Sequence, residues 1–398
     1  MKKFHFRVVI VGGGSAGISV ASRMLRKSKT LYDEIAIIDP ADHHYYQPLW
    51  TLVGAGAAKK EATKRDMGSV IPEGASWIQD RVIGFLPMEN KLQIANHQEI
   101  SYDYLVVAAG IELNWDGVKG LREAIGKNGV TTNYDYAYAD YTWEVIRSFQ
   151  GGTALFTHPA TPIKCGGAPQ KIMYLAEDYF ARTGIKKDAE VVFASANPAI
   201  FDVDKYRIAL EKVVERKQID TRFKRNLIEI RGEEKKAVFE HLDTKEQEVI
   251  AYDMLHVTPP MQAPAFIKNS ALADENGWVD VQKHTLQHVR YENIFALGDN
   301  SNLPTAKTGA AIRKQAPLVA NNILALMKEK SLEATYQGYS SCPVVTGYNK
   351  LILAEFDYNK QPTETLPFDQ GKERLSMYIL KKYFLPIMYW SGMLKGKM

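Results

Sequence analysis

The sequence contains no hydrophobic run that could cross a membrane, and it is poor in cysteine. No stretch reaches 18 consecutive apolar residues, so we expect no transmembrane helix. Met1-Lys2-Lys3 leads directly into the first predicted strand and leaves no room for a signal peptide, so we expect an intracellular chain. Only Cys165 and Cys342 occur among 398 residues, far apart in the sequence. A structural disulfide is not expected there, and the two are either buried small side chains or a reactive pair.

The sequence also lacks a strong charge imbalance and any metal-binding pattern. The net charge is +4, with no arginine-rich arm, so nucleic acid is not expected as a partner. His43 and His44 are adjacent and point different ways in an extended chain. His284 and His288 lie in strand-like and turn-like sequence rather than a helix. We therefore expect no bound metal.

The clearest positive signal lies at the start of the chain. The apolar, β-branched run 6–11 predicts a strand, and it is followed at the G-x-G-x-x-G spacing by Gly12, Gly14 and Gly17. Helical periodicity follows the glycines, and a second strand at 34–38 ends in Asp39. This order of strand, glycine turn, helix, strand and acid predicts a dinucleotide site, with pyrophosphate on the helix N-terminus and ribose on the acid.

Further strands are predicted within 75–82 and over 92–100 and 102–110. The last of these is an almost continuous apolar run ending in Gly110, a pattern typical of a covered parallel strand that opens on a ligand site. The aromatic loop 43–50 suits a flat ring ligand.

A second strand–helix–strand unit begins near residue 153, with a helix from about Pro169 and a strand at 190–194. The turn 195–199 has no glycine, and Pro198 removes an amide donor. We therefore expect a dinucleotide fold without a nicotinamide cofactor. Short runs at 228–230, 237–239 and 249–251 predict a small antiparallel sheet.

Cys165 lies in a setting that favours a reactive thiol. Two glycines follow it, a helix begins near Pro169, and Lys164 precedes it. A helix N-terminus and a neighbouring cation both stabilise a thiolate, so we expect a lowered pKa for Cys165.

Near the C-terminus, the predicted strand 293–299 ends in Asp299, at the strand end where open α/β sheets bind ligands. A loop and a helix to about residue 327 follow. Residues 371–398 hold six Lys or Arg residues against one Glu, with aromatic side chains between them. The run 383–390 is too short to span a membrane, and it suits the membrane interface or a helix packed on the protein.

These motifs together resemble the flavoproteins with two dinucleotide-binding domains, and among them the sulfide:quinone oxidoreductases, in the branch of the animal mitochondrial enzymes. The resemblance runs essentially end to end. Besides the glycine loop it rests on the segments 43–57, 164–177, 254–261, 297–311 and 342–358.

The resemblance implies an α/β fold with an FAD-binding domain at 1–115 and 291–330. It also implies a second Rossmann-like domain at 116–290 and a C-terminal quinone and membrane-interface region at 331–398. It assigns Cys165 and Cys342 as the catalytic pair. Its implied FAD ligands are Gly12, Gly14, Ser15, Ala16, Gly17, Asp39, Gln47, Val82, Asp299, Lys307, Thr308 and Gly309, to which the strand pattern adds Gly110. The quinone candidates are Phe356, Tyr383, Phe384 and Tyr389.

The implied activity is oxidation of sulfide to sulfane sulfur through a Cys165/Cys342 persulfide or bridged-sulfur intermediate. FAD is reduced and passes two electrons to ubiquinone or menaquinone, and a small thiol or other acceptor takes the sulfur. The third cysteine of many relatives is absent, and Asn300 stands where some relatives have cysteine. We expect a peripheral membrane protein on the cytoplasmic face, with homo-oligomer formation left open. The alternatives are a type II NADH:quinone oxidoreductase and a non-enzymatic flavoprotein that senses sulfur at the membrane.

Overall fold

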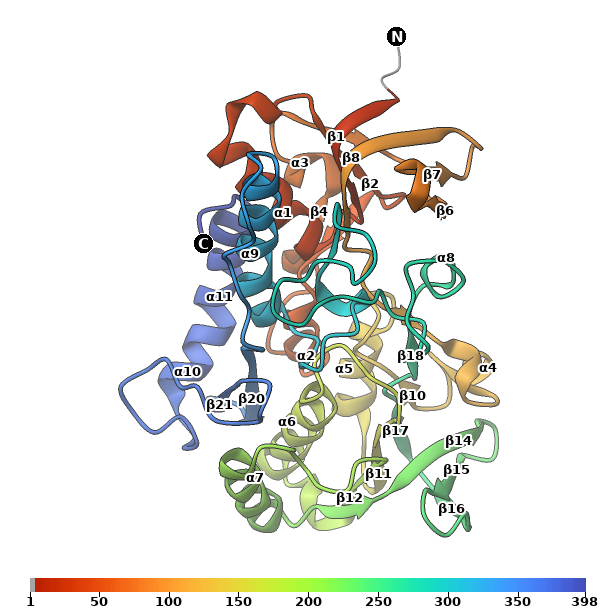
Figure 1. The fold of residues 1–398 in the computed structure, drawn as a ribbon. Coiled ribbons are helices and arrows are strands. Elements are labelled where there is room, and N and C mark those ends of the chain that lie inside the picture. Colours follow the sequence, from red (N-terminus) through yellow and green to blue (C-terminus); the bar gives the residue numbers. More distant parts are fainter. Residues whose placement is uncertain (1–3) are drawn as a thin grey trace.

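The computed structural model describes residues 4–398. The expectation about a signal peptide concerns Met1–Lys3, which lie outside the described residues. Two sheets of mostly parallel strands lie one above the other (Figure 1). The chain passes from the upper sheet to the lower one, returns to the upper one with β19 and α9, and ends in helical segments along one side.

The upper sheet has the order β5-β2-β1-β8-β7-β6, with β19 paired to β8. Its strands are β1 (His5–Val11), β2 (Ile35–Ile38), β5 (Ala75–Ile78), β6 (Val82–Leu86), β7 (Lys91–Ile94), β8 (Glu99–Val107) and β19 (Ile294–Ala296). β1 runs parallel to both β2 and β8, and β19 is parallel to β8. The apolar centres of β1, β2 and β8 are buried, as expected for strands covered on both faces.

One predicted strand is wrong. The run 92–100 is not continuous, because β7 turns back into the antiparallel strand β8. His97 adopts the left-handed conformation with φ of 63°, and the Asn96 side chain accepts a hydrogen bond from the Gln98 N–H at 3.0 Å. This is asparagine turn chemistry inside a run that otherwise alternates like a strand.

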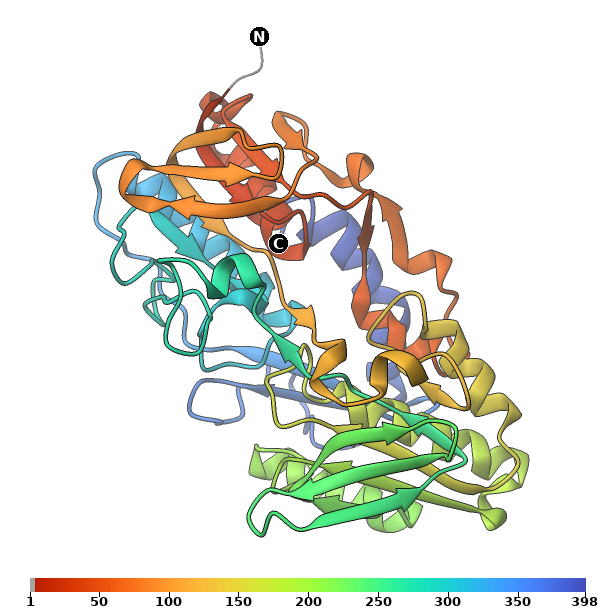
Figure 2. The same ribbon diagram turned by 90° about the vertical axis from the view of Figure 1, so that its right-hand side faces the viewer.

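The lower sheet has the order β10-β17-β11-β12-β13, and all its pairings are parallel. Its strands are β10 (Val130–Thr131), β11 (Gly152–His158), β12 (Ala189–Ser195), β13 (Asp220–Phe223) and β17 (Met254–His256). The predicted antiparallel sheet is confirmed as β14 (Arg225–Arg231), β15 (Lys236–His241) and β16 (Gln247–Ala251), which Figure 2 shows at the lower end of the molecule.

The helices and remaining strands connect and cover these sheets. The longer helices are α1 (Ser15–Lys27), α5 (Ala139–Ser148), α6 (Ala168–Thr183), α7 (Asp204–Lys217) and α9 (Gly309–Leu326). The short ones are α2 (Trp50–Val53), α3 (Met67–Val70), α4 (Leu121–Ala124) and α8 (Ala265–Lys268). Two small ribbons pair β3 (His43–Tyr45) with β4 (Lys64–Asp66) and β9 (Glu112–Leu113) with β18 (Met261–Gln262).

The C-terminal part consists of the hairpin β20 (Ser340–Gly347) and β21 (Lys350–Phe356), followed by a helical segment. This segment, called the C-terminal segment below, is α10 (Leu375–Ile379), η8 (Leu380–Phe384), α11 (Leu385–Ile387) and η9 (Met388–Met393), with residues 394–398. η8 and η9 are π-helical. Pro386 cannot donate a backbone hydrogen bond, which accounts for a locally widened helix around it. Within the described residues no helix is long and apolar enough to cross a membrane.

We predict that Gly17→Ala lowers both the melting temperature and the FAD content. A Cβ at Gly17 would lie 1.9 Å from the Gly12 carbonyl oxygen, so α1 would have to move away from β1. The control is Gly84→Ala in β6, where the nearest atom to the new Cβ is 3.8 Å away. A Gly17→Ala protein with unchanged melting and flavin content would contradict the close packing of α1.

Candidate functional site

The glycine loop between β1 and α1 has the shape of a pyrophosphate cradle. Gly12 has a φ of +108°, and a Cβ there would lie 2.4 Å from the Ala108 carbonyl oxygen. At Gly14 a Cβ would meet nothing within 4 Å, so open space lies directly above the backbone at the N-terminus of α1. Ser15 and Ala16 form the first turn of this helix. The amide groups and helix dipole here suit a phosphate.

Asp39 follows the end of β2, beside the glycine loop. Its carboxylate accepts hydrogen bonds from the Gly13 N–H at 2.6 Å and the Ala41 N–H at 2.8 Å. Each oxygen keeps a lone pair for a ribose hydroxyl. Gln47 is exposed at the start of a short 3-10 turn, and Val82 begins β6.

Asp299 stands after β19, at the carboxyl end of the upper sheet. Burial raises the pKa of its carboxyl, against the influence of Lys307 and Lys164. Within residues 4–398, no side-chain hydrogen bond reaches this carboxylate, which suits it to the hydroxyls of a ligand. The neighbouring Asn300 bridges two strand ends, because its side chain bonds the Val107 carbonyl and the Gly110 N–H, each at 3.1 Å.

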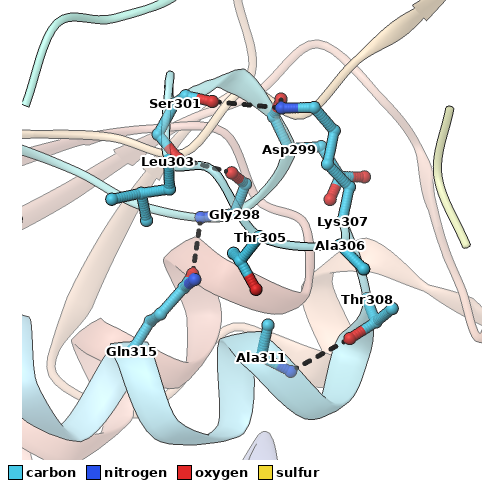
Figure 3. A pocket seen from close by; sticks show the side chains of 10 residues that line it. All are labelled: Gly298, Asp299, Ser301, Leu303, Thr305, Ala306, Lys307, Thr308, Ala311 and Gln315. Carbon is cyan, nitrogen blue, oxygen red and sulfur yellow. Dashed lines mark hydrogen bonds between the residues drawn. The ribbon is translucent and has the colours of Figure 1, made fainter. Parts of the chain in front are cut away.

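Residues 307–309 lie beside this strand end. Figure 3 shows Lys307 and Thr308 on the same pocket as Gly298 and Asp299. The Lys307 amine donates to the carbonyls of Asp299 and Ser301 at 2.6 and 3.0 Å, and burial lowers its pKa to about 8. The Thr308 side chain caps α9 by accepting the Ala311 N–H, and it also lies 2.8 Å from the Ser340 hydroxyl. Gly309 begins α9 with open space where a Cβ would lie.

Cys165 adopts a left-handed backbone conformation, with φ of 57°. Its N–H donates to the Lys307 carbonyl at 2.8 Å, and its carbonyl accepts the Ala168 N–H at 2.8 Å, just before α6. A non-glycine residue held in this region of φ is uncommon and is often found at functional sites. Cys165 is therefore fixed between the loop of Lys307 and the N-terminus of α6.

The structure brings the two cysteines together. The Sγ atoms of Cys165 and Cys342 are 3.9 Å apart, and both cysteines are free. Cys342 lies in β20 and packs against Gly167, where a Cβ would come within 2.3 Å of its Sγ. Gly167 is thus the residue whose missing side chain makes room for Cys342.

The cation beside Cys165 is Lys171, and the prediction of Lys164 is wrong. The Lys171 Nζ is 3.1 Å from the Cys165 Sγ, and Lys171 is buried in α6. The Lys164 amine lies instead over the Trp50 ring, 5.7 Å from its centroid. The pKa of Cys165 is held well below its ordinary value by a hydrogen bond from the Cys342 thiol, and then by the charge of Lys171. The direction of the predicted shift is therefore confirmed, with a different cause.

Cys342 has the opposite character. Its pKa is raised well above the ordinary value by its hydrogen bond to Cys165, by burial and by the negative charge on its partner. A second buried amine, Lys381 of the C-terminal segment, acts on both thiols. Burial and the charge of Lys171 lower the pKa of Lys381 to about 7, and its Nζ donates to the Pro48 carbonyl at 3.0 Å.

The four quinone candidates do not come together. Phe356 is buried in β21 with its ring 6.0 Å from that of Phe201. Tyr389 is buried against Tyr46, with ring centroids 4.4 Å apart. Tyr383 and Phe384 are 55% and 54% exposed on the outer face of the C-terminal segment.

In the glycine-free turn after β12, side chains of the turn make contacts within the chain. The Ser195 hydroxyl accepts the Asn197 N–H at 3.2 Å. The Asn197 side chain lies 3.3 Å from the buried His158 ring, at the end of β11.

Sequence reasoning missed Lys171, Lys381, Gly167 and Tyr134, whose hydroxyl lies 3.5 Å from the Cys165 carbonyl. One signal for Lys171 was available. It begins a helical stretch that is otherwise apolar, Lys171-Ile-Met-Tyr-Leu-Ala, near a helix N-terminus where a cation is electrostatically unfavourable. A lysine in that position needs an anionic partner.

Comparisons with known proteins agree with this geometry. Residues 6–142 match the pyridine nucleotide-disulphide oxidoreductase family. The mitochondrial sulfide:quinone oxidoreductase of Mus musculus is 48% identical, over 99% of this chain and 87% of its own. That of Dictyostelium discoideum is 49% identical, over 98% of this chain and 86% of its own. The structure of the Aquifex aeolicus sulfide:quinone oxidoreductase superposes with a TM-score of 0.84 at 20% identity, covering all of this chain and 92% of the other.

We predict that Lys171→Met raises the pH midpoint for alkylation of Cys165 in the reduced protein. Loss of the cation removes a stabilising charge from the thiolate, and an opposite charge at this range shifts a pKa by about 1–3 units. The measurement is the rate of modification by iodoacetamide against pH, followed by mass spectrometry. Lys164→Met is the matched control, with a smaller expected change. A larger shift of the pH midpoint in Lys164→Met than in Lys171→Met would show that Lys164 is the cation that lowers the pKa of Cys165.

Proposed function

The chain belongs to the sulfide:quinone oxidoreductase family, and from this membership we propose that it oxidises sulfide at Cys165 and Cys342 and reduces a membrane quinone. The observation that carries the proposal is the pair of thiols 3.9 Å apart beside a buried ammonium, next to the loop of Asp299 and Lys307. The enzyme is an FAD-dependent oxidoreductase.

The cofactor residues fit FAD. Open space above Gly14 would accept the pyrophosphate, Asp39 has lone pairs for the adenosine ribose, and the Asp299 carboxylate would face hydroxyls of the flavin chain. Gly309 and the N-terminus of α9 offer amide groups to the flavin ring. FAD, when bound, supplies the acceptor for two electrons and delivers them to the quinone.

The unequal thiols give the first step a direction. In a Cys165–Cys342 disulfide, the better leaving group is the sulfur with the lower thiol pKa, which is Cys165. Hydrosulfide therefore attacks the Cys342 sulfur. An S–S bond forms there, the S–S bond to Cys165 breaks, and the products are a Cys342 persulfide and a Cys165 thiolate. Lys171 stabilises the negative charge that develops on Cys165.

The second step releases the oxidised sulfur. A nucleophilic acceptor, such as a small thiolate, attacks the outer sulfur of the Cys342 persulfide and leaves a Cys342 thiolate. Re-forming the bond between the two thiolates is a two-electron oxidation, for which bound FAD would supply the acceptor. The charge of Lys171 opposes the rise in the pKa of Cys342 and so reduces the cost of the state in which both sulfurs are anionic.

The observed separation favours a bridge with one inserted sulfur over a direct disulfide. Two S–S bonds of about 2.05 Å meet at an angle at the central sulfur, so the outer sulfurs of such a bridge lie closer than about 4.1 Å, and the Sγ atoms need only a modest approach to form it. A direct disulfide requires the Sγ atoms to approach from 3.9 Å. These distances support a persulfide or bridged-sulfur intermediate.

A membrane surface is proposed as the third partner. Leu375, Ile379, Tyr383 and Ile387 are exposed and recur every fourth residue, so they form one stripe along the C-terminal segment. Phe384 widens the stripe, and Lys382 lies near its edge. An exposed apolar stripe with flanking basic groups suits insertion into the lipid interface. Ubiquinone or menaquinone would enter at this stripe, from a membrane whose cytoplasmic face the protein binds. The proposed domains are the FAD-binding domain at 1–115 and 291–330, the second Rossmann-like domain at 116–290 and the C-terminal region at 331–398.

We predict that Cys165→Ser and Cys342→Ser each lower sulfide-dependent quinone reduction by at least about a hundredfold, because both sulfurs act in one bond. The double variant should lose little more. Serine preserves volume, so FAD content, measured from the flavin spectrum after denaturation, should be unchanged. Near-normal turnover of Cys342→Ser would rule out the bridged mechanism.

We predict that Ile387→Glu weakens binding to anionic phospholipid vesicles by about tenfold or more, because a buried aliphatic side chain contributes about 1.5–3 kcal/mol. Quinone reduction in vesicles should fall with it, while flavin bleaching by sulfide should not. Ile208→Glu, at a residue 48% exposed in α7, is the matched control. If Ile387→Glu and Ile208→Glu lost vesicle binding equally, the proposal that the stripe docks on the membrane would be wrong.

A further inference from the structure

The C-terminal segment is seated along α1, the helix that carries the pyrophosphate cradle at its N-terminus. Ser22 donates to the Leu394 carbonyl at 2.6 Å. Arg23 donates to the carbonyls of Gly396 and Met398 at 3.2 and 2.9 Å. Gly396 approaches so closely that a Cβ there would lie 2.8 Å from the Arg23 backbone nitrogen. The segment and α1 lie side by side in both views of the fold (Figures 1 and 2).

One side chain of this segment reaches the cradle itself. The Tyr389 hydroxyl lies 2.6 Å from the Ser15 Oγ and 2.5 Å from the His44 Nε2. The opposite ring nitrogen of His44 lies 3.0 Å from the Gly13 carbonyl oxygen. Tyr389 and His44 are only 6% and 3% exposed, so water does not substitute for these bonds.

The direction of each bond follows from the groups involved. Burial lowers the pKa of His44 to about 4, so its ring is neutral at neutral pH and has one N–H. The Gly13 carbonyl can only accept, so that N–H is on Nδ1, and Nε2 accepts from the Tyr389 hydroxyl. The Tyr389 oxygen is then free to accept from the Ser15 hydroxyl. Hydrogen bonds thus link Ser15 to Tyr389, Tyr389 to His44 and His44 to Gly13, and the backbone from Gly13 to Ser15 closes the ring.

We propose that Tyr389 is a cofactor-positioning residue, through which the C-terminal segment holds residues 13–15 in the conformation that receives the FAD pyrophosphate. The inference rests on FAD binding at this loop. It adds that FAD retention depends on the segment that also carries the exposed apolar stripe.

The consequence of removing the hydroxyl is local. In Tyr389→Phe, the Ser15 hydroxyl and the His44 Nε2 lose their common partner in a buried place. The Ser15 side chain is then free to rotate. His44 keeps its bond to the Gly13 carbonyl but loses the bond at its other ring nitrogen, so it holds this carbonyl less firmly. We expect the loop to lose its preorganised shape, while the rest of the segment keeps its bonds to Ser22 and Arg23.

The test is the rate at which the holoenzyme loses FAD on dilution, followed by the rise in free flavin fluorescence. Tyr389→Phe should lose FAD about tenfold faster than the unmodified protein. Tyr378→Phe is the matched control, because Tyr378 is 3% exposed in the same segment and takes no part in the contacts of Tyr389 with Ser15 and His44. It should lose FAD at the unmodified rate.

A double-variant cycle separates positioning from a general loss of stability. Ser15→Ala should also speed FAD loss, and combining it with Tyr389→Phe should add little, because both remove the same bond. The melting temperature of the apoprotein should be alike in Tyr389→Phe and Tyr378→Phe. If Tyr389→Phe does not fold, His44→Phe, which removes the other partner of the same hydroxyl, carries the same expectation.

Two results would overturn the proposal. One is an unchanged FAD release rate in Tyr389→Phe or in Ser15→Ala, and the other is full additivity of the two. If the unmodified protein purified without FAD, the cofactor assignment would fail as well. Normal FAD content with unchanged release from the variants refutes the positioning role alone.

Discussion

The approach of Cys342 to Cys165 is the constraint on which the rest of the site depends. The two residues are 177 positions apart, and they meet because β20 passes the N-terminus of α6 at Gly167. Any side chain at Gly167 would occupy the place of the Cys342 sulfur. Cys165 in turn is bonded to Lys307 through its backbone, and Thr308 is bonded to Ser340 at the start of β20. One cluster of contacts therefore fixes the thiols relative to each other and to the strand end where FAD is expected.

The electrostatics of this cluster favour an anionic sulfur at Cys165. Lys171 is buried near the N-terminus of α6, where desolvation and the helix dipole both disfavour a cation. Its pKa is nevertheless raised, through the charges and hydrogen bonds of the two cysteines. Lys381, also buried but less closely paired, has its pKa lowered to about 7. The difference between the two amines follows from the 3.1 Å contact that Lys171 makes with Cys165.

Local patterns were enough to predict β1, the glycine loop, α1, β2 and Asp39, because each feature depends on neighbours within a few residues. The small antiparallel sheet followed from alternation in the same way. The break between β7 and β8 was missed because Asn96 and His97 interrupt an otherwise regular run by a single turn. Lys164 was chosen as the partner of Cys165 because it is adjacent in sequence, whereas Lys171 reaches the thiol from inside α6. The contact of Tyr389 with Ser15 joins residues 374 positions apart, and no local pattern encodes it.

The C-terminal segment combines roles that its sequence suggested were separate. Its basic and aromatic composition indicated either a membrane-facing strip or a helix packed on the protein, and the structure has a packed face and an exposed apolar face on one helical path. Every fourth residue from Leu375 to Ile387 points outward. From the opposite side, the charge of Lys381 influences the pKa of both thiols, and the Tyr389 hydroxyl contacts Ser15 in the glycine loop. A movement of this segment would also move a charge near the cysteines or a hydroxyl at the glycine loop. The same few turns of helix therefore set the geometry of the exposed apolar stripe and of contacts near the two cysteines.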